Sequence, residues 1–126
     1  MPLSLVRLEL ARDEKHPEGS ATRGYEFVAP LDANGHIDAD LWRKHRARCR
    51  VRRFWEGESD EDGLLVHRRG GSWAFHYDSE GAFDEDEPGY KFNSHVFDEG
   101  EYVSLREPDG DLRTFRVVSV RRFVGA

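Results

Sequence analysis

Several features that would assign a protein to a class are scarce or missing in this sequence. It has a single cysteine, Cys49, so an intrachain disulfide is excluded, as is typical of proteins from a reducing compartment. The apolar stretch at residues 1–10 is short and is interrupted by Arg7 and Glu9, so it predicts neither a signal peptide nor a membrane span. We therefore expect a cytoplasmic protein that does not bind a membrane.

The chain also lacks a net positive charge and the usual spacings of metal ligands. Its 19 Lys and Arg residues are outnumbered by 25 Asp and Glu, and the net charge of −6 argues against attraction of the whole domain to phosphate or anionic lipid. It contains no Cys-x-x-Cys, His-x-x-x-His or His-Glu-x-x-His motif. We predict no metal site and no cofactor, and a single domain over residues 1–126.

The clearest structural pattern is a hairpin at residues 100–120. Pro108-Asp109-Gly110 is typical of a turn with a bulge, in which glycine takes a positive φ. Counting outward from this turn places four apolar side chains on one face, namely Val103, Leu105, Phe115 and Val117.

A second hairpin is predicted at residues 63–77, with Gly70-Gly71 as a two-residue turn. This register pairs Arg68 with Trp73, Val66 with Phe75 and Leu64 with Tyr77. It predicts a cation–π contact between Arg68 and Trp73 near the tip.

The remaining regular elements are a helix and three short strands. Asp38 is a plausible N-cap for a helix near residues 38–49, with Leu41, Trp42, His45 and Cys49 on one face. Strands are expected at residues 3–10, 25–29 and 90–97, and acidic loops near residues 56–62 and 78–89. Together these elements predict a mainly β or α+β fold: a small antiparallel β-barrel or strongly bent sheet of about six or seven strands.

Two resemblances accompany this prediction. The segment Gly100-Glu101-Tyr102-Val103 is similar to the entry of small SH3-like and PUA-like barrels. The order GYEFVAPLDANG, CRVRRFW, GGSWAFHY, HVFDEGEYVSLRE and TFRVVSV resembles a family of small bacterial proteins with no known function, over most of residues 24–121. That resemblance implies no activity, cofactor or site.

A basic run at residues 43–53 is the main functional candidate. It carries seven Lys and Arg residues and no acid, and it is followed by Phe54 and Trp55, so it has the ingredients of a surface for anions or nucleic acid. The acidic loops could instead neutralise it within the fold, or could occupy it until a polyanion displaces them. The predicted binding residues are Arg43, Arg46, Arg48, Arg50, Arg52, Arg53, Trp55 and Trp73.

The pattern favours a non-catalytic cytoplasmic module that binds a protein or a nucleic acid through this basic and aromatic surface. The alternative is an enzyme or a small-ligand or metal-binding protein, with a pocket at the barrel mouth lined by His67, His76 and Cys49. Tyr102, Ser104 and Thr114, beside Arg116, share the second face of the C-terminal hairpin and are ordinary sheet residues or a polar site.

Overall fold

The computed structural model describes residues 3–67, 72–80, 91–92, 96–107 and 110–124. The elements in these ranges are β1 (Leu3–Leu10), β2 (Ser20–Ala29), α1 (Ala39–His45), the 3-10 helix η1 (Arg46–Arg48), β3 (Arg50–Trp55), β4 (Glu61–His67), β5 (Trp73–Tyr77), the 3-10 helix η2 (Asp78–Glu80), β6 (Lys91–Phe92), β7 (Tyr102–Arg106) and β8 (Leu112–Phe123). None of the helices in this described part is long and apolar enough to cross a membrane.

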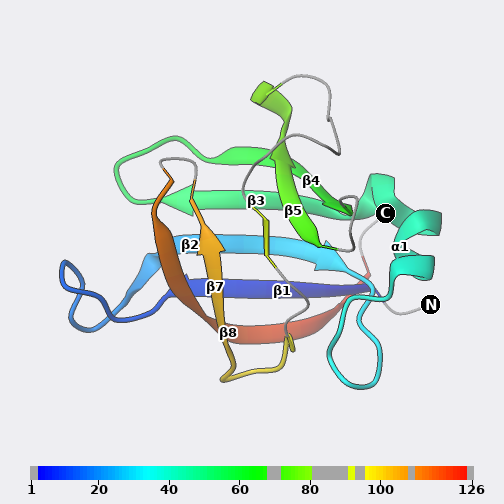
Figure 1. The fold of residues 1–126 in the computed structure, drawn as a ribbon, viewed down its shortest axis with the longest axis horizontal. Coiled ribbons are helices and arrows are strands. Elements are labelled where there is room, and N and C mark those ends of the chain that lie inside the picture. Colours follow the sequence, from blue (N-terminus) through cyan, green and yellow to red (C-terminus); the bar gives the residue numbers. More distant parts are fainter. Residues whose placement is uncertain (1–2, 68–71, 81–90, 93–95, 108–109, 125–126) are drawn as a thin grey trace.

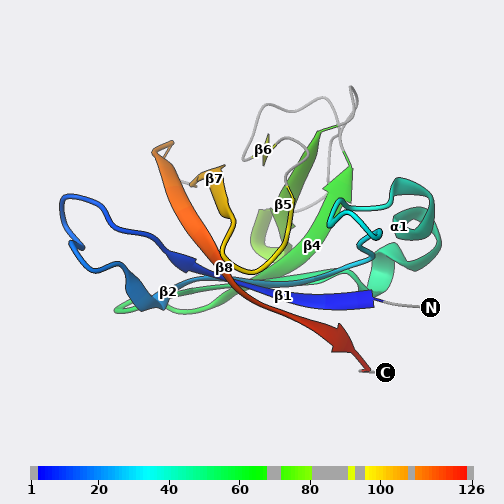
Figure 2. The ribbon, with the colours of Figure 1, turned by 90° about the horizontal axis from the view of Figure 1, so that it is seen from below.

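All of these strands belong to one antiparallel sheet, in the order β6-β5-β4-β3-β2-β1-β8-β7. Because β1 pairs with both β2 and β8, the first strand lies in the interior of the sheet, and the last strand, β8, lies beside it. The sheet curls into a half-barrel, with α1 at one end (Figures 1 and 2). This confirms the predicted fold class, a strongly bent antiparallel sheet with one short α-helix among the described residues.

Aromatic rings fill much of the concave face of the sheet. Tyr25 and Phe27 of β2 lie 5.3 and 5.2 Å from the ring of Phe75 on β5. Phe115 meets Tyr25 edge-on at 5.2 Å, and Phe97 meets Phe27 edge-on at 5.3 Å. Edge-to-face contacts of this kind are favourable and bury large apolar areas. The rings therefore supply much of the core.

The β7–β8 pairing has the register that the sequence predicts. Val103 lies opposite Phe115, and Ser104 lies opposite Thr114. Val103 and Phe115 are fully buried, as is Val117, which lies on the same face of β8 two residues after Phe115. The period-two alternation of apolar residues determines this register, because a slip of one residue would turn the apolar set toward solvent.

The turn between these strands also agrees with the prediction where it is described. Gly110 has a φ of +93°, the left-handed conformation expected of the bulged turn. Its N–H donates to the carbonyl of Glu107 at 2.8 Å, and the Glu107 N–H donates to the carbonyl of Asp111 at 2.7 Å. Residues 108–109 lie outside the described residues.

The predicted register of the β4–β5 hairpin is wrong by one residue. His67 lies opposite Trp73 and Leu65 opposite Phe75, so five residues separate the two strands instead of a two-residue turn. The observed register buries Leu65 together with Trp73 and Phe75 in the core. The turn glycines at 70–71 and Arg68 lie outside the described residues, and His67 takes the position opposite Trp73 that was assigned to Arg68.

The helix begins where predicted and ends earlier. The Asp38 carboxylate caps α1 by accepting a hydrogen bond from the Leu41 N–H at 3.1 Å. α1 ends at His45 and is followed by η1, so the predicted end at residue 49 is too late. Trp42 anchors the helix: its ring is buried, and its Nε1–H donates to the carbonyl of Leu65 at 2.9 Å.

Three other boundaries differ from the prediction. β2 begins at residue 20 instead of 25, and β4 begins at residue 61, within the expected acidic loop. Of the strand expected at residues 90–97, the structure describes a strand only at Lys91–Phe92, which is β6. Most of the second acidic loop, residues 81–89, lies outside the described residues.

Candidate functional site

Strand alternation divides the basic run between the two faces of the sheet. On β3, Val51 and Arg53 are buried on the concave side, whereas Arg50 and Arg52 are exposed on the convex side. Successive side chains of a strand point to opposite faces, so adjacent arginines cannot share a surface here. The run is therefore two separate sites, one inside and one outside.

The inner site is a buried network centred on Glu107, which is 1 % exposed. Arg53 Nη2 donates to Glu107 Oε1 at 3.1 Å, and the Tyr25 hydroxyl donates to Glu107 Oε2. Arg113 Nε approaches the same carboxylate at 3.8 Å. Burying a carboxylate is costly unless donors offset its desolvation, and these groups supply that compensation. Arg53 is thus an internal partner, not part of the surface for which the sequence predicted it.

Trp55 belongs to this inner site as well. The guanidinium of Arg53 lies 4.5 Å from the centre of its ring and that of Arg113 lies 5.5 Å away. The ring also contacts Phe115 edge-on at 6.4 Å. Because the indole is half-buried between these groups, it is not an open stacking platform.

Trp73 is 3 % exposed and is not part of a surface either. His67 stacks on it at 4.2 Å, and Trp42 meets it edge-on at 5.4 Å. Arg68, the predicted cation–π partner of Trp73, lies outside the described residues. Both tryptophans expected at the binding surface therefore lie against other side chains.

The outer arginines of β3 pair with acids from three parts of the chain. Arg52 donates to Glu26 on β2 and lies 3.8 Å from Asp60 in the β3–β4 connection. Arg50 Nη2 donates to Asp78, at the start of the second acidic segment, at 2.8 Å. The pairing within the fold that the sequence left open thus exists on this face. Each of these pairs is partly exposed to solvent.

The helical part of the run adds further exposed cations. Arg43 pairs with Asp40 on the same helix at 2.8 Å, in an exposed i,i+3 contact. Arg46 and Arg48 are exposed on η1. Across the described ranges Arg46 has no carboxylate within ion-pair distance.

A groove of about 330 Å³ lies where η1 meets the convex face of the sheet. Three arginines of the run line it, namely Arg48, Arg50 and Arg52. Apolar side chains from β1, β2 and β8 form its floor: Leu5, Val28 and Phe123. Two acids, Glu26 and Asp62, also line it, and Arg52 donates a hydrogen bond to Glu26.

Arg121 is a neighbour of this groove that the sequence reasoning missed. It is the ladder partner of Leu5 and lies on the convex face, because the adjacent Val120 pairs with the buried Val6. It is exposed. The signal for it is the pairing of β8 with β1, a contact between the two ends of the chain that local patterns do not reveal.

The alternative site at the barrel mouth is not assembled. His67 lies opposite Trp73 whereas His76 lies opposite Leu64, so the two imidazoles are on opposite faces of the β4–β5 hairpin. Cys49 is in the core, and burial raises the pKa of its thiol to about 11, which outweighs the opposing effect of Arg48. No cluster of metal-ligating side chains occurs among the residues described.

Comparison with family models, with curated proteins and with solved structures finds no match for this chain. The resemblance to a bacterial family therefore stays a prediction.

Proposed function

We propose that this protein is a non-catalytic binding module that holds an acidic segment of a partner protein in the groove between η1 and β3. One observation carries the proposal: Arg48, Arg50 and Arg52 line one groove together with apolar side chains of β1, β2 and β8. An apolar centre with an arginine rim is the composition of a protein-binding hot spot.

The chemistry of the rim favours carboxylates. Arg50 and Arg52 already bind the carboxylates of Asp78 and Glu26, so their guanidinium groups are placed for that partner. Guanidinium groups form paired, charge-assisted hydrogen bonds with carboxylates. An acidic segment from another protein would use the same donors.

A protein partner is favoured over nucleic acid for two reasons. Single-stranded nucleic acid needs open aromatic rings on which bases stack. Trp73 is buried, Trp55 is half-buried beneath Arg53, and the half-buried Phe54 ring is covered by the guanidinium groups of Arg7 and Arg52. The net charge of −6 also opposes the approach of a long polyanion. A short acidic segment needs no stacking platform, and it carries less charge to be repelled than a long polyanion does.

The internal acids set the strength of binding. The Arg50–Asp78 pair is about half exposed on both sides, and exposed pairs contribute at most about 1 kcal/mol to stability. A partner can therefore displace Asp78 at small cost. We expect affinity to fall steeply as salt is added, because the interaction is between charges at the surface.

The test is fluorescence anisotropy with a labelled peptide of alternating Glu and Leu residues and with a single-stranded oligonucleotide of the same charge. The double variant Arg48→Glu, Arg50→Glu should weaken peptide binding by about tenfold or more, since it reverses two charges of the rim. Arg53 is left unchanged, because a buried carboxylate at that position would face Glu107.

The matched control is Arg12→Glu, Lys15→Glu, which makes the same charge change in the segment between β1 and β2, at the far end of the sheet from α1 (Figure 1). It should bind the peptide as the native protein does. Equal losses in the two variants would mean that net charge alone, and not the groove, determines binding. Tighter binding of the oligonucleotide than of the peptide would mean that the partner is a nucleic acid and not a protein.

A further inference from the structure

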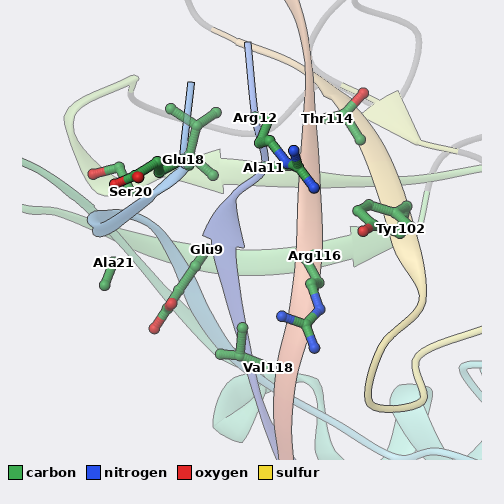
Figure 3. Close-up of a pocket in the computed structure, with 12 residues that line it drawn as sticks. Glu9, Ala11, Arg12, Glu18, Ser20, Ala21, Tyr102, Thr114, Arg116 and Val118 are labelled. Carbon is green, nitrogen blue, oxygen red and sulfur yellow. The ribbon is translucent and has the colours of Figure 1, made fainter. Parts of the chain in front are cut away.

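A second and larger groove lies on the convex face at the other end of the sheet, away from α1. Its volume is about 630 Å³, within the range typical of sites for small ligands. The segment between β1 and β2 forms one wall, and β7 and β8 form the other (Figure 3). It shares no lining residue with the groove between η1 and β3.

An irregularity in the sheet opens this groove. Glu9 pairs with Gly24, but the next residue, Leu10, pairs with Ser20, so β2 carries three extra residues at this point. Gly19 lies close to the backbone of β1 here. Its φ is +77°, and a Cβ at this position would lie 2.7 Å from the Leu10 carbonyl oxygen. Bulges next to sites commonly redirect side chains in this way.

Hydrogen bonds hold the wall in place. The Asp13 carboxylate accepts from the His16 N–H at 2.6 Å, and the Gly19 N–H donates to the His16 carbonyl at 2.9 Å. The Ala11 N–H donates to the Thr114 carbonyl at 3.0 Å, which ties this segment to β8. The groove is therefore a formed feature of the fold.

Two arginines of the groove are without carboxylate partners. The guanidinium groups of Arg12 and Arg116 both lie over the outer face of β8 (Figure 3). In the described ranges neither has a carboxylate within ion-pair distance. Glu9 is the ladder partner of Arg116, but its carboxylate binds Arg7 on the same strand, β1, at 2.8 Å. Glu9 points away from the two guanidinium groups (Figure 3). The half of the groove over β8 is thus cationic.

An aromatic ring and a hydroxyl group stand beside these cations. Tyr102 is 62 % exposed, and it is the ladder partner of Arg116. The Thr114 hydroxyl is within 3.2 Å of the Ser104 hydroxyl on β7. Tyrosine and arginine are both enriched in binding sites, and here an exposed tyrosine lies next to an arginine that makes no ion pair among the described residues.

We infer that this groove binds a small organic phosphate, with the phosphate between Arg12 and Arg116 and a ring of the ligand against Tyr102. Two guanidinium groups match the charge of a phosphate monoester, which is close to −2 at neutral pH. The acidic side of the groove, with Glu18, accepts hydrogen bonds from hydroxyl groups of a sugar or from an amino group. This ligand site is separate from the surface proposed for a protein partner.

The test is a titration of the ¹⁵N-labelled protein followed by amide chemical shifts. The probes are adenosine monophosphate, ribose 5-phosphate, adenosine and inorganic phosphate. We expect adenosine monophosphate to move the amides of Tyr102, Thr114 and Arg116, and adenosine to leave them unchanged. Ribose 5-phosphate binding as tightly as the nucleotide would identify a sugar phosphate as the ligand; both results support the phosphate site.

Variants assign the binding to the named side chains. Arg12→Gln with Arg116→Gln should lower affinity by about tenfold or more, because both charged donors are lost. Tyr102→Ala should weaken the nucleotide more than ribose 5-phosphate. The control Lys44→Gln with Arg46→Gln removes the same charge at the opposite end of the molecule. The inference is overturned if no phosphate probe moves these amides at millimolar concentration, or if the control weakens binding as much.

Discussion

The carboxylate of Glu107 receives donors from two strands that are far from it in the sequence. Tyr25 comes from β2 and Arg53 from β3, while Glu107 directly follows β7, at the start of the turn to β8. The network therefore joins the C-terminal hairpin to the middle of the sheet through a charge in the core. Such a charge is tolerated only while its partners remain.

We predict that Glu107→Gln lowers the free energy of unfolding by about 2 to 3 kcal/mol. The amide removes the charge that compensates Arg53, and breaking a buried pair costs about 3 to 5 kcal/mol when nothing else compensates it. The smaller value is expected because Glu58 remains within 3.1 Å of Arg53. Urea unfolding measures the difference.

Glu14→Gln, at an exposed position, serves as the control and should change stability little. Combining Glu107→Gln with Arg53→Met should recover part of the loss, since no unpaired charge then remains on β3. A loss below about 1 kcal/mol for Glu107→Gln alone would mean that the network does not stabilise the fold.

At the scale of elements, the two hairpins differ in how well their sequences determine them. The β7–β8 turn contains Gly110 between residues that fix the bend, and the apolar alternation on both sides agrees with only one register. In β4–β5 the residues at positions 64, 65 and 66 are all apolar, so a slip of one residue still buries apolar groups. Packing in the aromatic core determines the β4–β5 register, and no local sequence pattern predicts that packing.

We predict that Gly110→Ala costs about 1 kcal/mol of stability. A Cβ at this position meets no atom within 4 Å, so the cost comes only from the φ of +93°. Gly110→Asn should cost less, because asparagine tolerates the left-handed conformation better. Thermal unfolding of both variants compares them; equal stability of the alanine variant and the native protein would contradict the turn assignment.

Short-range sequence patterns predict the fold of the whole molecule better than they predict its sites. The N-cap at Asp38 and the strand alternation in β1 and β7–β8 were readable from the sequence. The alternation of Val51, Arg53 and Trp55 was also readable and would have placed Arg53 inside. Arg121 could not be assigned, because only the pairing of β8 with β1 places it beside Leu5, which lines the groove.

Charge is also organised at the scale of the molecule. Residues 43–53 carry seven positive charges in sequence, yet the fold separates them into a buried pair with Glu107, pairs with acids on the convex face and exposed cations on α1 and η1. A run of one charge in sequence is therefore not one surface in space. The protein binding proposed for the groove between η1 and β3 depends on this separation.

Arginine modification with phenylglyoxal, followed by mass spectrometry of the peptides, tests this separation most directly. In the native protein Arg46, Arg50 and Arg52 should react, and Arg53 should react only after denaturant is added, because its side chain is about nine-tenths buried against Glu107 and Trp55. Modification of Arg53 at the rate of Arg50 in the native protein would contradict the division of the basic run between the two faces of the sheet.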